Sequence, residues 1–311
     1  MHGLPGHPDR SVSLIWLAIH LSDRYDQVGA PKDLDDAIVL EREALALRPQ
    51  GHPDRSSSLN NLAVDLFSRY KCLGAMEDLD EAIVLDREAL NLRPRGHPLR
   101  SSSLINLAVH LSARHKQLGA MQDLHEAISL NQEALILCQA GHPDRSMSLN
   151  NLAVDLSTRY NQVGAMNDLD EAIVLDREAL DLRPQGHLHR SMSLNNLANR
   201  LSTRYEQLGV MNDLDEAISV NREALDLCPQ GHPDRSTSLS NLAIRLSIWS
   251  EQLGVMEDLD EAIVLVREAL VFRLQGHPDW SGSLHNLAWC LWKRFIRSEL
   301  FTEESKVTHN V

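Results

Sequence analysis

The chain has 311 residues, few cysteines and no long apolar run. Its four cysteines include no C-x-x-C pair, which argues against a disulfide framework. Nowhere do 18 apolar residues follow one another, and the opening residues, MHGLPGHPDR, have neither the basic flank nor the apolar stretch of a secretory signal. These absences predict a soluble, cytoplasmic protein with reduced thiols.

Basic residues are also in the minority. The 44 acidic and 30 basic side chains leave a net charge of −14, which argues against nucleic acids and anionic membranes as main partners. Hydrophobic residues make up 43% of the chain and charged residues 24%. This composition is typical of a folded chain and too apolar for a disordered one.

The sequence contains a repeat with a strict period of 45 residues. Residues 51–95 and 141–185 differ at nine of 45 positions, and an opening Gly-His pair recurs at residues 6, 51, 96, 141, 186, 231 and 276. A fixed period of 20 to 50 residues is typical of stacked repeats, in which each unit buries its apolar face against its neighbours. We therefore expect a single array over residues 1–296, with six full units and a partial seventh, followed by a polar, disordered tail at 297–311.

Each unit reads as two helices. In the unit 141–185, one apolar stripe is Leu149, Leu152, Ala153 and Leu156, and Gly164 can adopt the positive φ that ends a helix. The second helix is expected to open at residues 168–171, Asp-Leu-Asp-Glu, as a capping box in which Asp168 accepts backbone N–H groups. The fold class is therefore all-α.

Paired helices with this stripe, followed by Ala172, Ala179 and Pro184, resemble the tetratricopeptide repeat. The phrase HPDRSMSLNNLAVDL resembles more closely the kinesin light chain subclass of that family. The resemblance implies a right-handed superhelix, an α-solenoid, that acts as a scaffold or adaptor for a protein or peptide. One departure is Asp176, which stands where the family has an aromatic residue in the second helix, so Tyr160 is expected to help fill that space.

The near-identical units also resemble arrays from basidiomycete fungi, which are often joined to a caspase-like CHAT domain or an NTPase module. An alternative function is therefore that of a sensor arm, or fragment, of a larger signalling protein. The chain shows no P-loop pattern and no recognisable Cys-His protease segment. Its acidic and histidine clusters recur with the repeat, whereas a catalytic site is needed once, so we expect no enzyme activity, no cofactor and no metal site.

A helical wheel at about 100° per residue predicts which side chains of the first helices face a partner. Opposite the core lies a row of asparagines: Asn61, Asn106, Asn151, Asn196, Asn241 and Asn286. The adjoining row is mostly apolar: Ile19, Val64, Val109, Val154, Ile244 and Trp289, with Asn199 in the fifth unit. Amide side chains can bond to an extended peptide, and the apolar row can take its side chains. Alternatively, the asparagines only solvate an exposed face, or they bond to the neighbouring repeat.

A third row, beside these two, varies in chemistry along the chain. It consists of His20, Asp65, His110, Asp155, Arg200, Arg245 and Cys290. We expect these side chains to be exposed. Its acidic members Asp65 and Asp155 and its basic members Arg200 and Arg245 would then select a partner of opposite polarity, and drift at an exposed site is the alternative.

Seven loop histidines, one in each unit, are expected to shape the turn before each first helix: His7, His52, His97, His142, His187, His232 and His277. One histidine per unit is too widely spaced to chelate a metal. Residues 284–296 are apolar nearly all round, which favours burial of this last helix. The array is therefore expected to continue in a longer parent protein, to dimerise through an end, or to be a truncated gene product.

Overall fold

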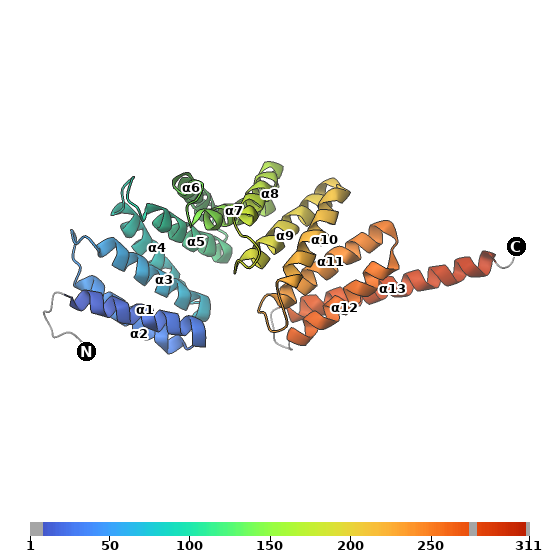
Figure 1. Cartoon of the computed structure of the whole chain (residues 1–311), viewed down its shortest axis with the longest axis horizontal. Coiled ribbons are helices and arrows are strands. Elements are labelled where there is room, and N and C mark those ends of the chain that lie inside the picture. The colour runs from blue at the N-terminus through green and yellow to red at the C-terminus, as the bar shows by residue number, and fades with distance from the viewer. Residues whose placement is uncertain (1–8, 274–278, 309–311) are drawn as a thin grey trace. The chain divides into compact units, whose positions relative to one another are not determined.

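The computed structural model describes residues 9–273 and 279–308, with side chains as far as residue 298, and these residues form thirteen helices and no strand (Figure 1). The first helices of the units are α1 (Arg10–Val28), α3 (Arg55–Leu73), α5 (Arg100–Leu118), α7 (Arg145–Val163), α9 (Arg190–Leu208), α11 (Arg235–Leu253) and α13 (Trp280–Thr308). The second helices are α2 (Pro31–Ala46), α4 (Met76–Asn91), α6 (Met121–Leu137), α8 (Met166–Asp181), α10 (Met211–Asp226) and α12 (Met256–Phe272).

The chain divides into two compact units, Met1–Arg159 and Tyr160–Val311, with the division inside α7. In the first unit each helix from α1 to α6 packs on the next, and in the second unit the same holds from α8 to α13. The predicted architecture of helix pairs repeated along the chain is confirmed. The last helix does not stop at residue 296, where the array was expected to end, but continues to Thr308.

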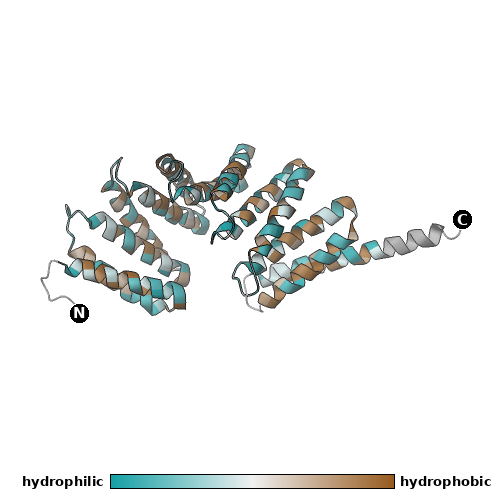
Figure 2. Cartoon of the chain, viewed as in Figure 1, coloured by the Kyte–Doolittle hydropathy of each residue, from teal (hydrophilic) through white to brown (hydrophobic). Residues whose placement is uncertain are grey.

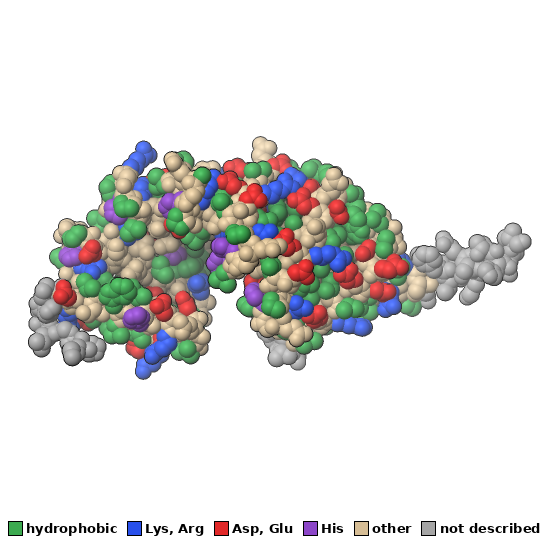
Figure 3. Space-filling model, viewed as in Figure 1, with side chains coloured by type: hydrophobic (Ala, Val, Ile, Leu, Met, Phe, Trp, Pro, Cys, Tyr) green, Lys and Arg blue, Asp and Glu red, His purple; other side chains and the backbone are tan. Residues whose placement is uncertain are grey.

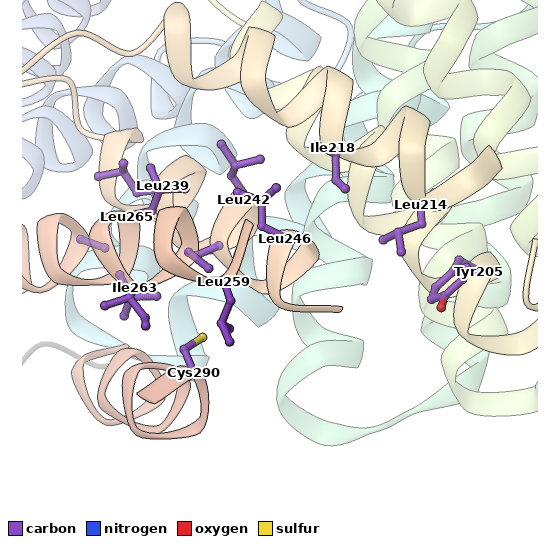
Figure 4. Close-up of a cluster of buried hydrophobic side chains, with 14 residues drawn as sticks. Tyr205, Leu214, Ile218, Leu239, Leu242, Leu246, Leu259, Ile263, Leu265 and Cys290 are labelled. Carbon is purple, nitrogen blue, oxygen red and sulfur yellow. The ribbon is translucent and has the colours of Figure 1, made fainter. Parts of the chain in front are cut away.

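The core lies between the helices of each pair and the helix that follows. All four residues of the predicted stripe, from Leu149 to Leu156, are buried. Figure 2 shows that the helices carry apolar and polar residues on different sides, as expected of helices that are half covered. Figure 4 shows a hydrophobic cluster of the second unit, to which α10 contributes Leu214, α11 contributes Leu239 and Leu242, and α12 contributes Leu259. Tyr160 belongs to another cluster, together with Leu169 and Ile173. That it fills the space at Asp176 stays a prediction.

A glycine ends most of the first helices, as the sequence predicts. Gly164 has φ of +74°, and its N–H donates to the carbonyl of Tyr160 at 2.7 Å. Only glycine adopts this left-handed conformation without a steric cost. The equivalent tight turns after α3 and α5 let the second helix of each of those repeats fold back on the first.

The expected capping box is wrong. The second helix of the fourth unit starts at Met166, and its N-cap residue, Ala165, makes no side-chain capping bond. The first aspartate of the Asp-Leu-Asp-Glu motif therefore lies inside the first turn. In the second repeat, the carboxylate of Asp78 accepts two hydrogen bonds from the guanidinium of Arg69, each 2.7 Å long. The motif thus joins the two helices of one repeat by a bidentate ion pair.

The glutamate that ends this motif contributes to a second set of ion pairs. It contacts an arginine on the second helix of the preceding repeat. The pairs are Arg42–Glu81, Arg87–Glu126, Arg177–Glu216 and Arg222–Glu261. These side chains are partly exposed. Figure 3 shows acidic and basic side chains interspersed over the visible face of the unit that carries α8–α13.

The loop histidines shape the turns that precede the first helices, as predicted. The Nδ1 atom of His52 accepts the N–H of Asp54 at 3.1 Å, and His97, His142, His187 and His232 make the equivalent bond. His7 and His277 lie outside the described residues. The helix begins at Arg55, two residues after Pro53, rather than at the proline.

Candidate partner-binding face

The apolar row lies open on the side of the first helices away from the core. Val64 is 39% exposed, Val154 40% and Trp289 41%, while Ile19, Val109 and Ile244 are half-buried. Valines with this exposure are not needed to cover the core. They leave apolar surface at a spacing of one side chain per repeat in the first four repeats, and Asn199 interrupts the row in the fifth.

The asparagine row is half-buried throughout, and its members differ in their hydrogen bonds. Asn106 donates to the Oδ1 atom of Asn60 at 3.2 Å, and Asn241 donates to that of Asn195 at 3.3 Å. Both acceptors lie on the first helix of the preceding repeat. Asn106 and Asn241 therefore bond to the neighbouring repeat, which was the alternative prediction for this row.

Other members of this row have no such acceptor, because the preceding repeat carries a different residue there. Ile105 takes the place of the acceptor before Asn151, and Ile15 takes it before Asn61. Within the described residues, the side chains of Asn61 and Asn151 make no hydrogen bond. Their amides are available to a ligand.

The prediction that the side chains of the third row are exposed is wrong for all but one of them. Asp65 is 6% exposed, Asp155 3%, and both Arg200 and Arg245 5%. Asp65, Arg200 and Arg245 lie on the flank of a first helix that packs against the second helix of the preceding repeat, and Asp155 contacts Asn131 of that helix. His20 alone in the row is exposed, since no described helix precedes α1.

Each buried member of the row, apart from Arg245, faces the residue 24 positions earlier in the chain. His110 Nδ1 lies 2.6 Å from a carboxylate oxygen of Asp86, and the amide of Asn131 donates to Asp155 at 2.8 Å. Arg200 donates to Asp176 at 2.5 Å. Asp176, which replaces the aromatic residue of the family, therefore holds a buried ion pair between two repeats.

Arg245 is an exception, because no carboxylate contacts it among the described residues. Its guanidinium donates to the carbonyl of Asn241 at 2.8 Å and to Oδ1 of Asn199 at 2.6 Å. Burial lowers the pKa of Arg245 to about 10. The residue 24 positions earlier, Asn221, donates to Asn195 instead.

The interface between the first and second repeats pairs two acids. Glu41 and Asp65 interact, and Ser22 donates its hydroxyl proton to Asp65 at 2.8 Å. Burial, followed by the nearby charge of Asp65, raises the pKa of Glu41 to about 9. Burial also raises the pKa of Asp65 to about 6. Desolvation penalises the charged form of a carboxyl group, so this pair retains a proton near neutral pH.

Two hollows open on the first-helix face above such pairs. One, of about 230 Å³, is lined by Ile19, Asn61 and Val64 above Glu41 and Asp65. The other, of about 280 Å³, has Ile244, Asn286 and Trp289 in the equivalent places, above Val266 and Cys290. The two predicted rows thus meet the buried third row at these hollows.

The last helix carries exposed apolar side chains. Trp292 is 51% exposed and Phe295 59%, and the ammonium of Lys293 lies 4.6 Å from the ring centre of Trp289. Self-association through this helix stays a prediction. None of the described helices has the length and apolar character needed to cross a membrane.

The fold and its repeated face define a class, the helical-repeat proteins. Three segments, residues 55–99, 145–183 and 190–234, match the family described as tetratricopeptide repeat. The predicted resemblance to the tetratricopeptide repeat is confirmed for these three segments. The predicted link to fungal arrays with CHAT or NTPase domains stays a prediction.

Solved structures show the same fold. A putative kinesin light chain of Podospora anserina with nearly identical repeats has a TM-score of 0.50 and 22% identity, over 70% of this chain and 98% of that one. BtubC of P. vanneervenii has a TM-score of 0.51 and 17% identity, over 83% and 87%. Acl4, the assembly chaperone of RpL4, has a TM-score of 0.52 and 13% identity, over 94% and 99%. Among curated proteins, no sequence matches this chain significantly.

Proposed function

We propose that this protein is a non-enzymatic scaffold that binds an extended segment of a protein partner along its first-helix face. The observation that supports this is the neighbourhood of Val64 and Val154. Each lies exposed one turn from an asparagine, Asn61 or Asn151, whose amide makes no hydrogen bond within the described residues. An amide offers two donors and an acceptor, which suits the backbone of an extended peptide.

The two rows have different parts in this proposal. The asparagines bond to the peptide backbone and hold its direction, and the valines contact its side chains. Because the same pair recurs in successive repeats, a partner gains contacts as its length increases. The family to which the repeats belong supports this function, since tetratricopeptide repeats are protein-interaction modules and fold alone does not specify the partner.

The test uses a displayed library of random peptides selected on the whole chain, with binding then measured by fluorescence anisotropy. The variant Asn61→Ala/Asn151→Ala is expected to weaken binding about tenfold, because it removes two hydrogen bonds of about 0.5–1.5 kcal/mol each. Asn106→Ala is the matched control. Its amide already bonds to Asn60, so we expect a smaller loss of peptide affinity.

Equal binding by the wild type and the double variant would contradict this proposal. Circular dichroism must show that all three chains are equally helical. A partner retained by the double variant would instead bind another surface, such as the exposed aromatic side chains of α13.

A further inference from the structure

One side of α13 is uncovered, whereas the same side of α9 is buried. In α9, Leu201 and Tyr205 are buried, and Tyr205 belongs to one cluster with Leu214 of α10, the helix that packs on α9. The corresponding residues of α13 are Leu291 and Phe295. Phe295 is 59% exposed, whereas Tyr205 is 9% exposed. The side that a second helix covers on α9 is therefore open on α13.

No described segment folds back over this side, because α13 does not turn. Gly209, with φ of +68°, ends α9, and its N–H donates to the carbonyl of Tyr205 at 2.7 Å. The corresponding residue of the last repeat is Glu299, and only glycine adopts this conformation without a steric cost. Figure 1 shows α13 continuing past this position as one helix, which extends to Thr308. A helix that covers the open side must therefore come from outside the described residues.

An arginine on the same side lacks one of the two partners that its counterpart has. Arg204 of α9 bonds to Asp170 of α8 at 3.0 Å and, through two bonds of 2.7 and 2.8 Å, to Asp213 of α10. Arg294 occupies the same position in α13 and pairs with Asp260 of α12 at 2.9 Å. No second carboxylate contacts it among the side chains described. The side chain of Arg294 is 52% exposed and that of Arg204 22%, so Arg294 is open to a carboxylate on a covering helix.

A second arginine, on α12, also lacks the partner that its counterparts have. Arg177 pairs with Glu216 and Arg222 pairs with Glu261, in each case on the next second helix. Arg267 occupies the same position in α12 and is exposed. It contacts no carboxylate among the described side chains. Two arginines thus mark the places at which a further second helix would present its acidic residues.

The charge of α13 favours an acidic partner helix over a second copy of the same helix. Residues 280–298 include Lys293, Arg294 and Arg297 and no acidic residue, although the whole chain has a net charge of −14. The second helix α10, in contrast, has five acidic residues and one basic residue. Opposite charges across an interface favour association, and like charges oppose it.

We propose that the open side of α13 binds an acidic amphipathic helix of a partner protein, in the place that α10 takes on α9. The open side consists of Leu284, Ala288, Leu291, Arg294 and Phe295. The apolar stripe of the bound helix packs on Leu291 and Phe295, and an aspartate of its first turn pairs with Arg294. This surface is separate from the asparagine row and the apolar row, so the inference goes beyond the proposed function.

The experiment is a fluorescence anisotropy titration of a labelled peptide with the whole chain at low ionic strength. The peptide has the sequence of residues 211–226, which form the helix that covers α9. We expect saturable binding and a gain of helical circular dichroism, because a helix of this length is marginal alone in water. A peptide with Asp213→Lys and Glu216→Lys, which reverses the charges that meet Arg294 and Arg267, should bind about tenfold more weakly.

An exchange of charges shows whether the peptide lies on α13. Arg294→Glu in the chain should weaken binding about tenfold, and the peptide with Asp213→Lys should recover most of this loss. Arg267→Glu and the peptide with Glu216→Lys should behave in the same way. Arg95→Glu makes the same change at an exposed position in the first half of the chain. It is the matched control and should leave binding unchanged.

Phe295→Glu tests the apolar part of the site and should abolish binding. Because Phe295 is exposed, the variant should be as helical as the wild type, and Val264→Glu, at an exposed position of α12, is its matched control. Peptide binding that is unchanged in both Arg294→Glu and Phe295→Glu would overturn the inference. Absence of peptide binding up to about 0.5 mM chain would overturn it too.

Two further measurements distinguish this site from the alternatives. If sedimentation velocity shows a dimer that Phe295→Glu dissociates and that the peptide does not disrupt, a second copy covers α13 and the inference is overturned. Asn61→Ala/Asn151→Ala should bind the helical peptide as tightly as the wild type does. A loss of affinity in that variant would assign the peptide to the first-helix face and would also overturn the inference, whereas the proposed function would stand.

Discussion

Two interfaces between repeats use the same positions for opposite chemistry. Where α3 packs on α2, the paired positions hold Glu41 and Asp65, and where α13 packs on α12, they hold Val266 and Cys290. Each pair lies under a hollow of a few hundred Å³ lined by the same rows. The linings differ at other places too, since Asp23 of the first hollow corresponds to Ile248 in the second, so several side chains together decide whether a hollow is acidic or apolar.

The interfaces between these extremes show that the paired positions change together. A histidine or arginine faces an aspartate at His110 and Arg200, while Asp155 faces the amide of Asn131. At these three interfaces the first helix therefore complements the second helix that precedes it. We infer that these pairs help near-identical repeats to distinguish their correct neighbours, because a mismatched pair would bury an unpaired charge.

The largest effect is expected from breaking a charged interface. Asp176→Ala leaves the guanidinium of Arg200 buried without its partner, and a buried pair broken in this way loses about 3–5 kcal/mol. We expect a marked decrease in the urea concentration at the midpoint of unfolding, followed by circular dichroism. The double variant Asp176→Leu/Arg200→Met, which makes this interface apolar like that of Val266 and Cys290, should recover most of the loss. A single variant as stable as the wild type would contradict the importance of the pair.

The acidic interface should make stability depend on pH. The folded-state pKa of Glu41 is raised from 4.5 to about 9, so the folded chain keeps a proton that the unfolded chain releases. The stability contributed by this group is complete below pH 4.5 and is lost as the pH rises toward 9. Replacing Glu41 by Gln should remove this loss.

In urea unfolding, Glu41→Gln should therefore gain on the wild type by about 1 kcal/mol per pH unit at most, between pH 6 and pH 8. Glu77→Gln alters an exposed glutamate and should show no such trend. If the stabilities of Glu41→Gln and the wild type run parallel with pH, Glu41 is ionised in the folded chain and the acidic pair does not hold a proton.

A smaller loss of stability, similar in different repeats, is expected from substitutions in the glycine turns that the repeats share. Gly74 has φ of +73° and Gly254 has φ of +77°, and an added Cβ would meet no atom at either. Alanine should therefore cost about 1 kcal/mol at each position from backbone strain alone. Gly282→Ala, inside α13, is the control and should be neutral or stabilising. Thermal unfolding would show whether the two turns respond equally although their interfaces differ.

The smallest effect is expected on the exposed ion pairs. Arg177 and Glu216 are 45% and 37% exposed, and such pairs contribute about 0.2–1 kcal/mol. Arg177→Ala should thus lower the free energy of unfolding far less than Asp176→Ala, its neighbour in the sequence. A loss equal to that of the buried pair would show that this surface network is coupled to the core.

The local parts of the fold could be predicted from the sequence because they depend on neighbouring residues. The stripe from Leu149 to Leu156 and the stop at Gly164 follow from helical periodicity and backbone sterics. The capping box failed at Asp168 because two conformations of the chain satisfy the same motif. An aspartate at this spacing can cap a helix or, as at Asp78, pair with an arginine across the turn, and only the packed hairpin decides between them.

The candidate site could be predicted only in part, because a helical wheel considers one helix in isolation. A helical wheel has one core direction, and it placed Val64 and Val154 correctly on the open face. A first helix of this array has two buried sides, one against its own second helix and one against that of the preceding repeat. Asp65 and Arg200 lie on the second of these sides, which the wheel of an isolated helix does not contain.

The sequence by itself determined the 45-residue period, the helix pairs and the rows of side chains, because these follow from local propensity and from exact repetition. Only the tertiary structure decided which rows are open and which polar residues meet. Glu41 and Asp65 are 24 residues apart, and their contact, their raised pKa values and the hollow above them arise when one repeat packs on another. Burial in that interface, rather than residue type, sets their charge.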